Sequence, residues 1–132
     1  MNKPLKFRRV EGTFSIVQLP TGSAVPTWAQ KEGLFSITRT PDELSIVCRR
    51  ECVPPDVKND RRWVCFKLEG PFAFSEVGIL ASFIAPLADA GIPIFAISTY
   101  DTDYVLIPEE LTGMALAALN KAGHQLVPDD AN

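Results

Sequence analysis

The sequence has little of the chemistry that metal sites and disulfide frameworks require. Its 132 residues include one histidine, His124, and three cysteines, Cys48, Cys52 and Cys65. A structural zinc site needs four nitrogen or sulfur ligands, and His124 lies far along the chain from the cysteines, so we expect no metal. An odd cysteine count in a chain with 46% apolar residues argues against disulfides and predicts buried, inert thiols.

Catalytic motifs are also missing. The chain has no Gly-x-Ser-x-Gly elbow, no phosphate-binding glycine loop and no His-Glu-x-x-His pair. His124 follows a predicted helix, where a positive charge is favourable, and that ordinary role is sufficient to explain it. We therefore expect a protein that is not an enzyme and carries no cofactor.

Long apolar runs and a basic excess are lacking too. The longest apolar stretch, residues 77–87, is interrupted by Ser82 and Pro86 and is too short to span a bilayer. The basic N-terminus has no apolar segment behind it, so it does not resemble a secretory signal. A net charge of −3 and a pI of about 5.1 argue against nucleic acid as a partner. These features predict a cytoplasmic protein without membrane contact.

The charges that are present are unevenly distributed. Residues 1–62 hold 11 Lys and Arg against 7 Asp and Glu, whereas residues 63–132 hold 2 against 9. The acidic second half would favour a cationic ligand. The ordinary alternative is that both halves carry solvated charged faces.

Hydrophobic periodicity organises the C-terminal half into six elements. Alternating apolar residues predict strands, and apolar residues at helical spacing predict two helices. Ser75 is a plausible N-cap for the first helix, and Pro86 inside it must free the carbonyl of Ser82. The elements are a strand at 63–68, a helix at 75–90, a hairpin of strands at 94–99 and 104–107, a helix between Pro108 and Gly123, and a strand at 125–127.

This order, β-α-β-β-α-β, predicts an α+β fold of the ferredoxin-like type. Two crossover helices would cover one face of a four-stranded antiparallel sheet. Residues 34–47 repeat the hairpin segment 94–107 at an offset of 60, which indicates a degenerate internal duplication. The first unit is poorer, since it offers only about one helical turn around Trp28. We expect an N-terminal unit at 1–62 and a C-terminal unit at 63–132.

Four segments carry a family resemblance that covers nearly the whole chain. The sequence resembles two-ACT-domain bacterial proteins related to the eukaryotic cytosolic arginine sensors. The resemblance implies tandem ACT units that pair into a continuous sheet, and a small ligand, such as an amino acid, held where units meet. The segments are Phe35 to Glu43, Phe74 to Ala81, Ile84 to Ile92 and Ile97 to Leu106.

The resemblance also implies which residues bind the ligand. The arginine sensors carry four ACT units in one chain, so an equivalent site here would need a homodimer. A helix start presents unsatisfied N–H groups to a carboxylate, while Glu76 and Asp103 could accept from an ammonium or a basic side chain. A basic amino acid is therefore favoured. The matching positions are Ser75, Glu76, Val77, Gly78, Ile79, Pro93, Ile94 and Asp103.

Simpler roles for these residues stay open. Ser75 is also explained as a helix cap, Gly78 as relief of helix–sheet packing, and Asp103 as a turn residue. The alternative function is a protein–protein interaction or dimerisation module without a ligand. Ligand-dependent thermal stabilisation separates the two, because only a binder of the native state raises the melting temperature by mass action.

Overall fold

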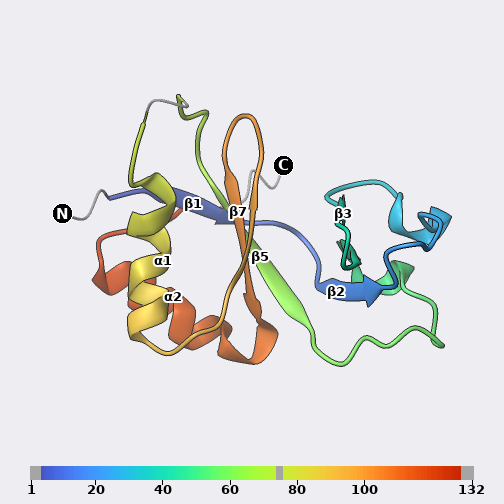
Figure 1. Ribbon diagram of the computed structural model, residues 1–132. Helices are drawn as coiled ribbons and strands as arrows, with labels where there is room; N and C mark the ends of the chain where they lie inside the picture. The colour runs from blue at the N-terminus through green and yellow to red at the C-terminus, as the bar shows by residue number, and fades with distance from the viewer. Residues whose placement is uncertain (1–3, 74–75, 129–132) are drawn as a thin grey trace. The chain divides into compact units, whose positions relative to one another are not determined.

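The computed structural model describes residues 4–73 and 76–128 (Figure 1). The chain divides into two compact units. One consists of Met1–Glu11 together with Val64–Asn132, and the other is Gly12–Trp63. The expected boundary after residue 62 lies within one residue of the observed one, whereas the first eleven residues belong with the C-terminal unit. The division at that boundary into two ACT-like units stays a prediction.

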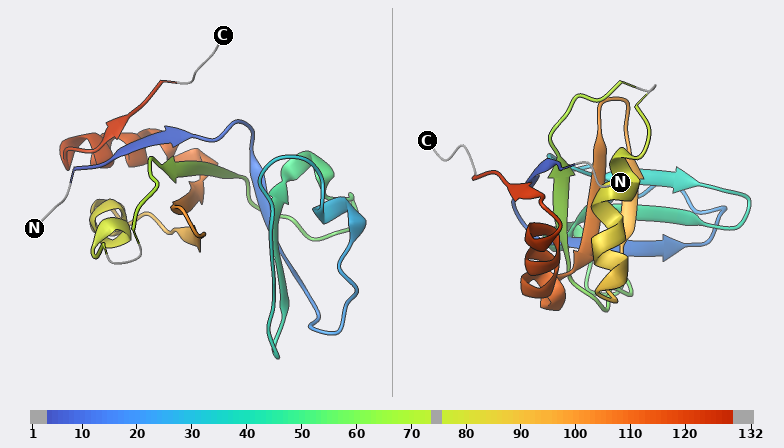
Figure 2. Two further views of the ribbon diagram at one scale, coloured as in Figure 1. Left: turned by 90° about the horizontal axis from the view of Figure 1, so that it is seen from above. Right: turned by 90° about the vertical axis from the view of Figure 1, so that its left-hand side faces the viewer.

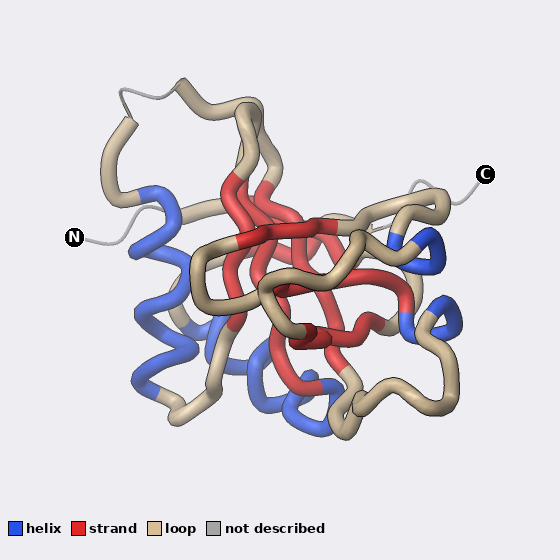
Figure 3. Tube along the Cα trace, turned by 45° about the vertical axis from the view of Figure 1, so that its right-hand side comes forward, coloured by secondary structure: helices blue, strands red, loops and turns tan. Residues whose placement is uncertain are grey.

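The C-terminal unit is a five-stranded sheet with two helices. Its strands lie in the order β8-β1-β5-β7-β6. In the right-hand view of Figure 2 both helices lie in front of the strands, so they cover one face, and Figure 3 shows the same layering. The elements are β1 (Lys6–Arg9), β5 (Trp63–Leu68), α1 (Ile79–Asp89), β6 (Phe95–Ser98), β7 (Asp103–Pro108), the 3-10 turn η3 (Glu109–Leu111), α2 (Thr112–Lys121) and β8 (Gln125–Leu126).

The helices and strands expected from periodicity are all present, which confirms the α+β, ferredoxin-like fold class. The fifth strand, β1, was not expected. It runs antiparallel to β5, with Phe7 opposite Leu68, and parallel to β8. Phe7 is its one fully buried side chain, and Lys6, Arg8 and Arg9 around it give the segment the appearance of a polar tail. Four residues with one apolar position carry too little pattern to predict a strand.

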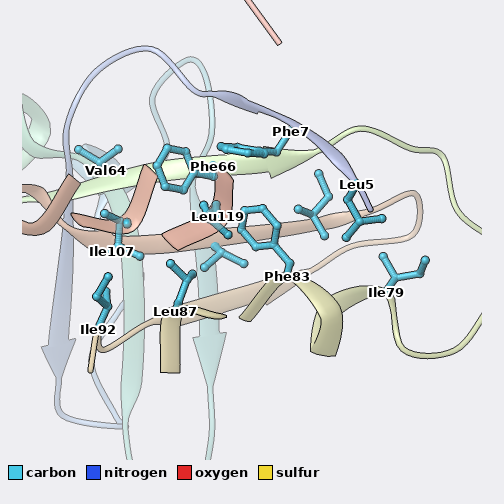
Figure 4. Close-up of a cluster of buried hydrophobic side chains, with 13 residues drawn as sticks. Leu5, Phe7, Val64, Phe66, Ile79, Phe83, Leu87, Ile92, Ile107 and Leu119 are labelled. Carbon is cyan, nitrogen blue, oxygen red and sulfur yellow. The ribbon is translucent and has the colours of Figure 1, made fainter. Parts of the chain in front are cut away.

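The core of this unit lies between the sheet and the helices (Figure 4). Phe7, Phe66 and Phe83 pack edge to face, with ring centroids 5.1–6.5 Å apart. Edge-to-face pairs place the positive ring edge against a negative ring face and add to the burial of apolar area. Leu87, from the next turn of α1, and Leu119, from α2, are fully buried in the same cluster. The strand β1 therefore supplies part of the core.

Helix α1 begins four residues later than expected. Its N-cap is Gly78, whose φ of 79° lies in the left-handed region, so the helix cannot extend back through this residue. The proposed N-cap Ser75 lies outside the described residues. The first helical hydrogen bond runs from the Ser82 amide to the Gly78 carbonyl, at 2.9 Å.

The N-terminal unit is a three-stranded antiparallel sheet in the order β3-β4-β2. Val17, Leu44, Ile46 and Cys48 form its small core, with Ala29 fully buried beside them. As expected, one helical turn surrounds Trp28. The elements are β2 (Phe14–Leu19), the 3-10 turn η1 (Thr27–Ala29), β3 (Ser36–Arg39), β4 (Leu44–Arg49) and the 3-10 turn η2 (Arg50–Cys52).

Both units contain the expected hairpin, but the offset between them is 59 rather than 60. Arg39 pairs with Leu44 across one four-residue turn, and Ser98 pairs with Asp103 across the other. Thr40 and Thr99 begin these turns, and each donates its amide to the carbonyl of the fourth turn residue. An offset of 60 aligns identical residues, Phe35 with Phe95 and Ile37 with Ile97, so residue identity alone favours it over the paired positions.

Candidate functional site

A hollow of about 220 Å³ lies in the C-terminal unit, beside the start of α1. The segment before the helix forms one wall, and the turn between β6 and β7 forms the other. In Figure 1 both segments lie at the upper end of this unit. The lining residues are Phe72, Ala73, Glu76, Ile79, Ser98, Thr99, Tyr100, Asp101, Thr102 and Asp103.

Two hydrogen bonds connect the two walls. The buried Thr102 hydroxyl donates to the Leu68 carbonyl at 2.8 Å, and the Phe72 amide donates to the Asp101 carbonyl at 2.9 Å. Gly70 leaves room for this approach, because a Cβ there would lie 3.0 Å from the Asp101 oxygen. These contacts hold the β6–β7 turn against the segment that leads to α1.

The carboxylates of the hollow are held by short-range hydrogen bonds. Glu76 Oε1 accepts from the Ala73 amide at 3.0 Å, and the Ala73 carbonyl accepts from the Glu76 amide at 3.0 Å. Asp103 accepts from the Ser98 hydroxyl. Each carboxylate has a second oxygen and further lone pairs, so it can still accept hydrogen bonds from a ligand.

The electrostatic character of the hollow follows from its lining. Glu76, Asp101 and Asp103 are acidic, and none of the lining residues is Lys or Arg. Phe72 and Ile79 add apolar surface. Carboxylates grouped without a fixed cation favour a positively charged group, through charge-assisted hydrogen bonds.

The structure brings three of the eight expected site residues into this hollow. They are Glu76, Ile79 and Asp103. Val77 is 81% exposed next to it, and Gly78 caps the helix, with open space where a Cβ would lie. These two lie between lining residues without lining the hollow themselves.

Two further expected residues lie elsewhere, and one cannot be placed. Pro93 is exposed, and Ile94 packs partly buried against the core just before β6. Ser75 lies outside the described residues. Sequence reasoning missed Phe72 and Thr102. A threonine in a polar turn gives no sign that its hydroxyl is buried, although an aromatic residue after Gly-Pro could have suggested a wall.

Other chemistry is sparse in the described ranges 4–73 and 76–128. Within them, no group of three or more His, Cys, Asp or Glu side chains is arranged to hold a metal ion. Burial raises the pKa of Cys65 to about 12, and burial with nearby Cys52 and Glu51 raises that of Cys48 to about 11. No helix in the same ranges is both long and apolar enough to cross a bilayer.

Family models match both parts of the chain. An ACT-domain model matches residues 58–121, and a model that describes an N-terminal domain matches residues 12–56. The crystal structure of protein Atu0741 from Agobacterium tumefaciens is 42% identical, with a TM-score of 0.91, and the match covers 98% of this chain and 97% of that one. The regulatory subunit of aspartate kinase from Thermus flavus shares the fold at 14% identity, with a TM-score of 0.60 over 91% and 99% of the two chains. The chain is therefore an ACT-domain protein.

Sequence comparison narrows the family. The human cytosolic arginine sensor for mTORC1 subunit 1 is 37% identical over 60 residues, and the human putative protein CASTOR3P is 35% identical over 86 residues. These matches cover 45% and 55% of this chain, but only 18% and 53% of the two human proteins. The chain belongs to the ACT-domain proteins related to the cytosolic arginine sensors.

Proposed function

We propose that this protein is a non-catalytic, cytoplasmic sensor that binds a basic amino acid in the acidic hollow of its C-terminal unit. The observation that carries the proposal is the grouping of Glu76, Asp101 and Asp103 in a lining without Lys or Arg. The ACT-domain match and the relationship to proteins named as arginine sensors support a regulatory ligand-sensing role. In this proposal, ligand binding regulates the protein and is not followed by chemical conversion of the ligand.

The two ends of an amino acid would meet different parts of the site. Its cationic groups accept no hydrogen bonds and pair with the carboxylates of Glu76 and Asp103. Its carboxylate meets the first turn of α1 around Val77, Gly78 and Ile79, where backbone N–H groups have no helical acceptor. In this proposal Ser75 belongs to the same segment.

The ligand site is completed by a second copy of the chain. In the described part of the sheet, β6 pairs only with β7, so its other edge is open to another strand. Pro93 and Ile94 lead into this edge, which gives these two residues a place in the site although they do not line the hollow. Val77, next to the hollow, and Tyr100, in its lining, are 81% and 79% exposed and would be covered by the partner copy. Residues 12–62 would then form a degenerate ACT-like unit, while residues 1–11 belong with the C-terminal ACT domain.

Calorimetric titration of the full chain with arginine, lysine, glutamate and leucine tests the proposal. We expect saturable binding of arginine or lysine and none of glutamate. Light scattering of the same samples should give twice the chain mass of 14.5 kDa. Tighter binding of glutamate, or a monomer unchanged by any of these ligands, would contradict the proposal.

A second candidate function is dimerisation or docking without a ligand. The exposed side chains of Val77 and Tyr100, together with the open edge of β6, favour it. It predicts a dimer whose melting temperature does not change with any free amino acid, whereas the sensor is stabilised by its ligand.

A further inference from the structure

A second hollow lies in the N-terminal unit, next to the guanidinium of Arg49 at the end of β4. The Arg49 side chain is fixed by its neighbours. Its Cζ lies 5.9 Å from the centroid of the Phe14 ring, a cation–π contact. It also packs on Gly12, where a Cβ would lie 3.0 Å from Cζ and Nη1, and where φ is +97°. The position of the charge is therefore set by the fold.

The polar partners of this guanidinium are few. Its Nη1 donates to Glu51 Oε2 at 3.5 Å, which is long for a charge-assisted bond, and the Glu51 side chain is 67% exposed. Arg49 Nε is buried and has no hydrogen-bond partner among the described residues. A guanidinium has five N–H donors, and native structures rarely leave a buried donor unmatched. Arg49 thus has more donor capacity than the chain itself uses.

The hollow beside Arg49 has a volume of about 630 Å³. Lys31 adds a second positive charge, and Gly33, with φ of +88°, brings bare backbone to the wall. Glu32 and Glu51 also line it, so the two positive and two negative formal charges of the lining cancel in sum. Lys31 and Arg49 attract an anion that lies between them. The two glutamates repel a dianion more strongly than a monoanion, so the hollow favours a singly charged anion.

We propose that this hollow binds a small organic carboxylate, held by Arg49 and Lys31. The planar guanidinium matches the two oxygens of a carboxylate, which Lys alone does not. Binding displaces the exposed Glu51 from its long contact and gives Arg49 a shorter partner. This site is separate from the acidic hollow beside α1, and the proposal does not depend on that site's function.

Nuclear magnetic resonance of the full ¹⁵N-labelled chain tests this site with three probes, namely acetate, inorganic phosphate and methylammonium, at constant ionic strength. Acetate should shift the Gly33 amide and the Arg49 side-chain Nε–H saturably. Phosphate should bind more weakly, and methylammonium should leave both signals in place. Residues Glu76 and Asp103 report separately on the other hollow.

Two substitutions complete the test. Arg49→Met keeps the stacking on Phe14 but removes the charge, and should weaken acetate binding at least tenfold. Glu51→Gln removes the internal competitor and should tighten it several-fold, which decides the matter if Arg49→Met does not fold. The absence of saturable shifts in the native protein, tighter binding of phosphate, or unchanged affinity in Glu51→Gln would each overturn the proposal.

Discussion

The Nε2 atom of His124 lies 2.8 Å from the carbonyl oxygen of Ser82, a residue in the middle of α1. Pro86 has no N–H to offer this carbonyl, so the ring supplies the donor from the end of α2. The Leu5 amide donates to His124 Nδ1 at 3.1 Å, which leaves the proton on Nε2. His124 is 2% exposed, so it is a buried neutral bridge rather than the charged helix cap that its position in the sequence indicated.

Replacing His124 should therefore destabilise the fold. His124→Phe keeps the ring volume but leaves the Leu5 amide without its acceptor and removes the donor to Ser82. We expect a loss of about 2–4 kcal/mol in the free energy of unfolding, measured by urea denaturation. Asn120→Ala, an exposed change on α2, is the control and should stay within about 0.5 kcal/mol. Equal stability of the two variants would show that the bridge contributes little.

The proposed ligand site predicts a loss of binding without a loss of folding. Asp103→Ala removes one charge-assisted hydrogen bond to the ligand's cationic group, which should weaken arginine binding by about 2–5 kcal/mol. Asp89→Asn removes an exposed acid from the end of α1, outside the hollow, and is the matched control. Calorimetry should find binding retained in the control alone. Undiminished arginine binding in Asp103→Ala would show that this carboxylate only stabilises the turn.

The turn that carries Asp103 depends on Thr102. Thr102→Val has nearly the same shape but cannot donate to the Leu68 carbonyl, so we expect about 1–3 kcal/mol of destabilisation and weaker ligand binding. Thr112→Val removes a hydroxyl that donates to the Glu109 carbonyl at 2.7 Å, away from the hollow. This control should lose stability without losing the ligand. A Thr102→Val protein with native affinity would show that the hollow forms without this anchor.

How far the sequence predicts the molecule depends on the kind of contact. Periodicity located every helix and strand of the C-terminal unit except β1, because those elements repeat apolar positions and β1 has only Phe7. Glu76 and Asp103, which the family pattern suggested, line the hollow, and their role in ligand binding stays a prediction. The contacts of Gly70 and Thr102 with backbone carbonyls were not predicted. Every residue has a backbone carbonyl, so the amino-acid sequence does not show which carbonyls these two residues will contact.

The thiols should differ in reactivity. Burial raises the pKa of Cys65 to about 12 and that of Cys48 to about 11, so at pH 8 neither forms a significant amount of thiolate. Only the half-buried Cys52 should react quickly with a thiol reagent in the native protein. Mass spectrometry after labelling should show one adduct, and none in Cys52→Ser. Rapid labelling of Cys48 or Cys65 would indicate that the cores open readily.

Acid should weaken the pairing of β1 with the end of β5. The side-chain hydrogen bond from Arg8 holds the pKa of Glu69 below its ordinary value of 4.5. The folded state thus favours the carboxylate, so this contribution is present above pH 4.5 and is lost as the pH falls through the lower folded value. Glu69→Gln should lose less stability than the native protein between pH 6 and pH 3, as followed by urea denaturation. Glu11→Gln is the control, and equal pH slopes in all three proteins would contradict the prediction.

The strand β1 makes the C-terminal unit discontinuous in sequence. Its core needs Phe7 from one end of the chain and Leu119 from the other, with the whole N-terminal unit inserted between them. During synthesis residues 12–63 can fold while β1 waits for β5 and β8 to emerge, so the C-terminal unit forms last and through contacts of high sequence separation. A fragment starting at residue 63, the natural choice for cutting out the ACT domain, would lack an internal strand and should expose apolar core to aggregation.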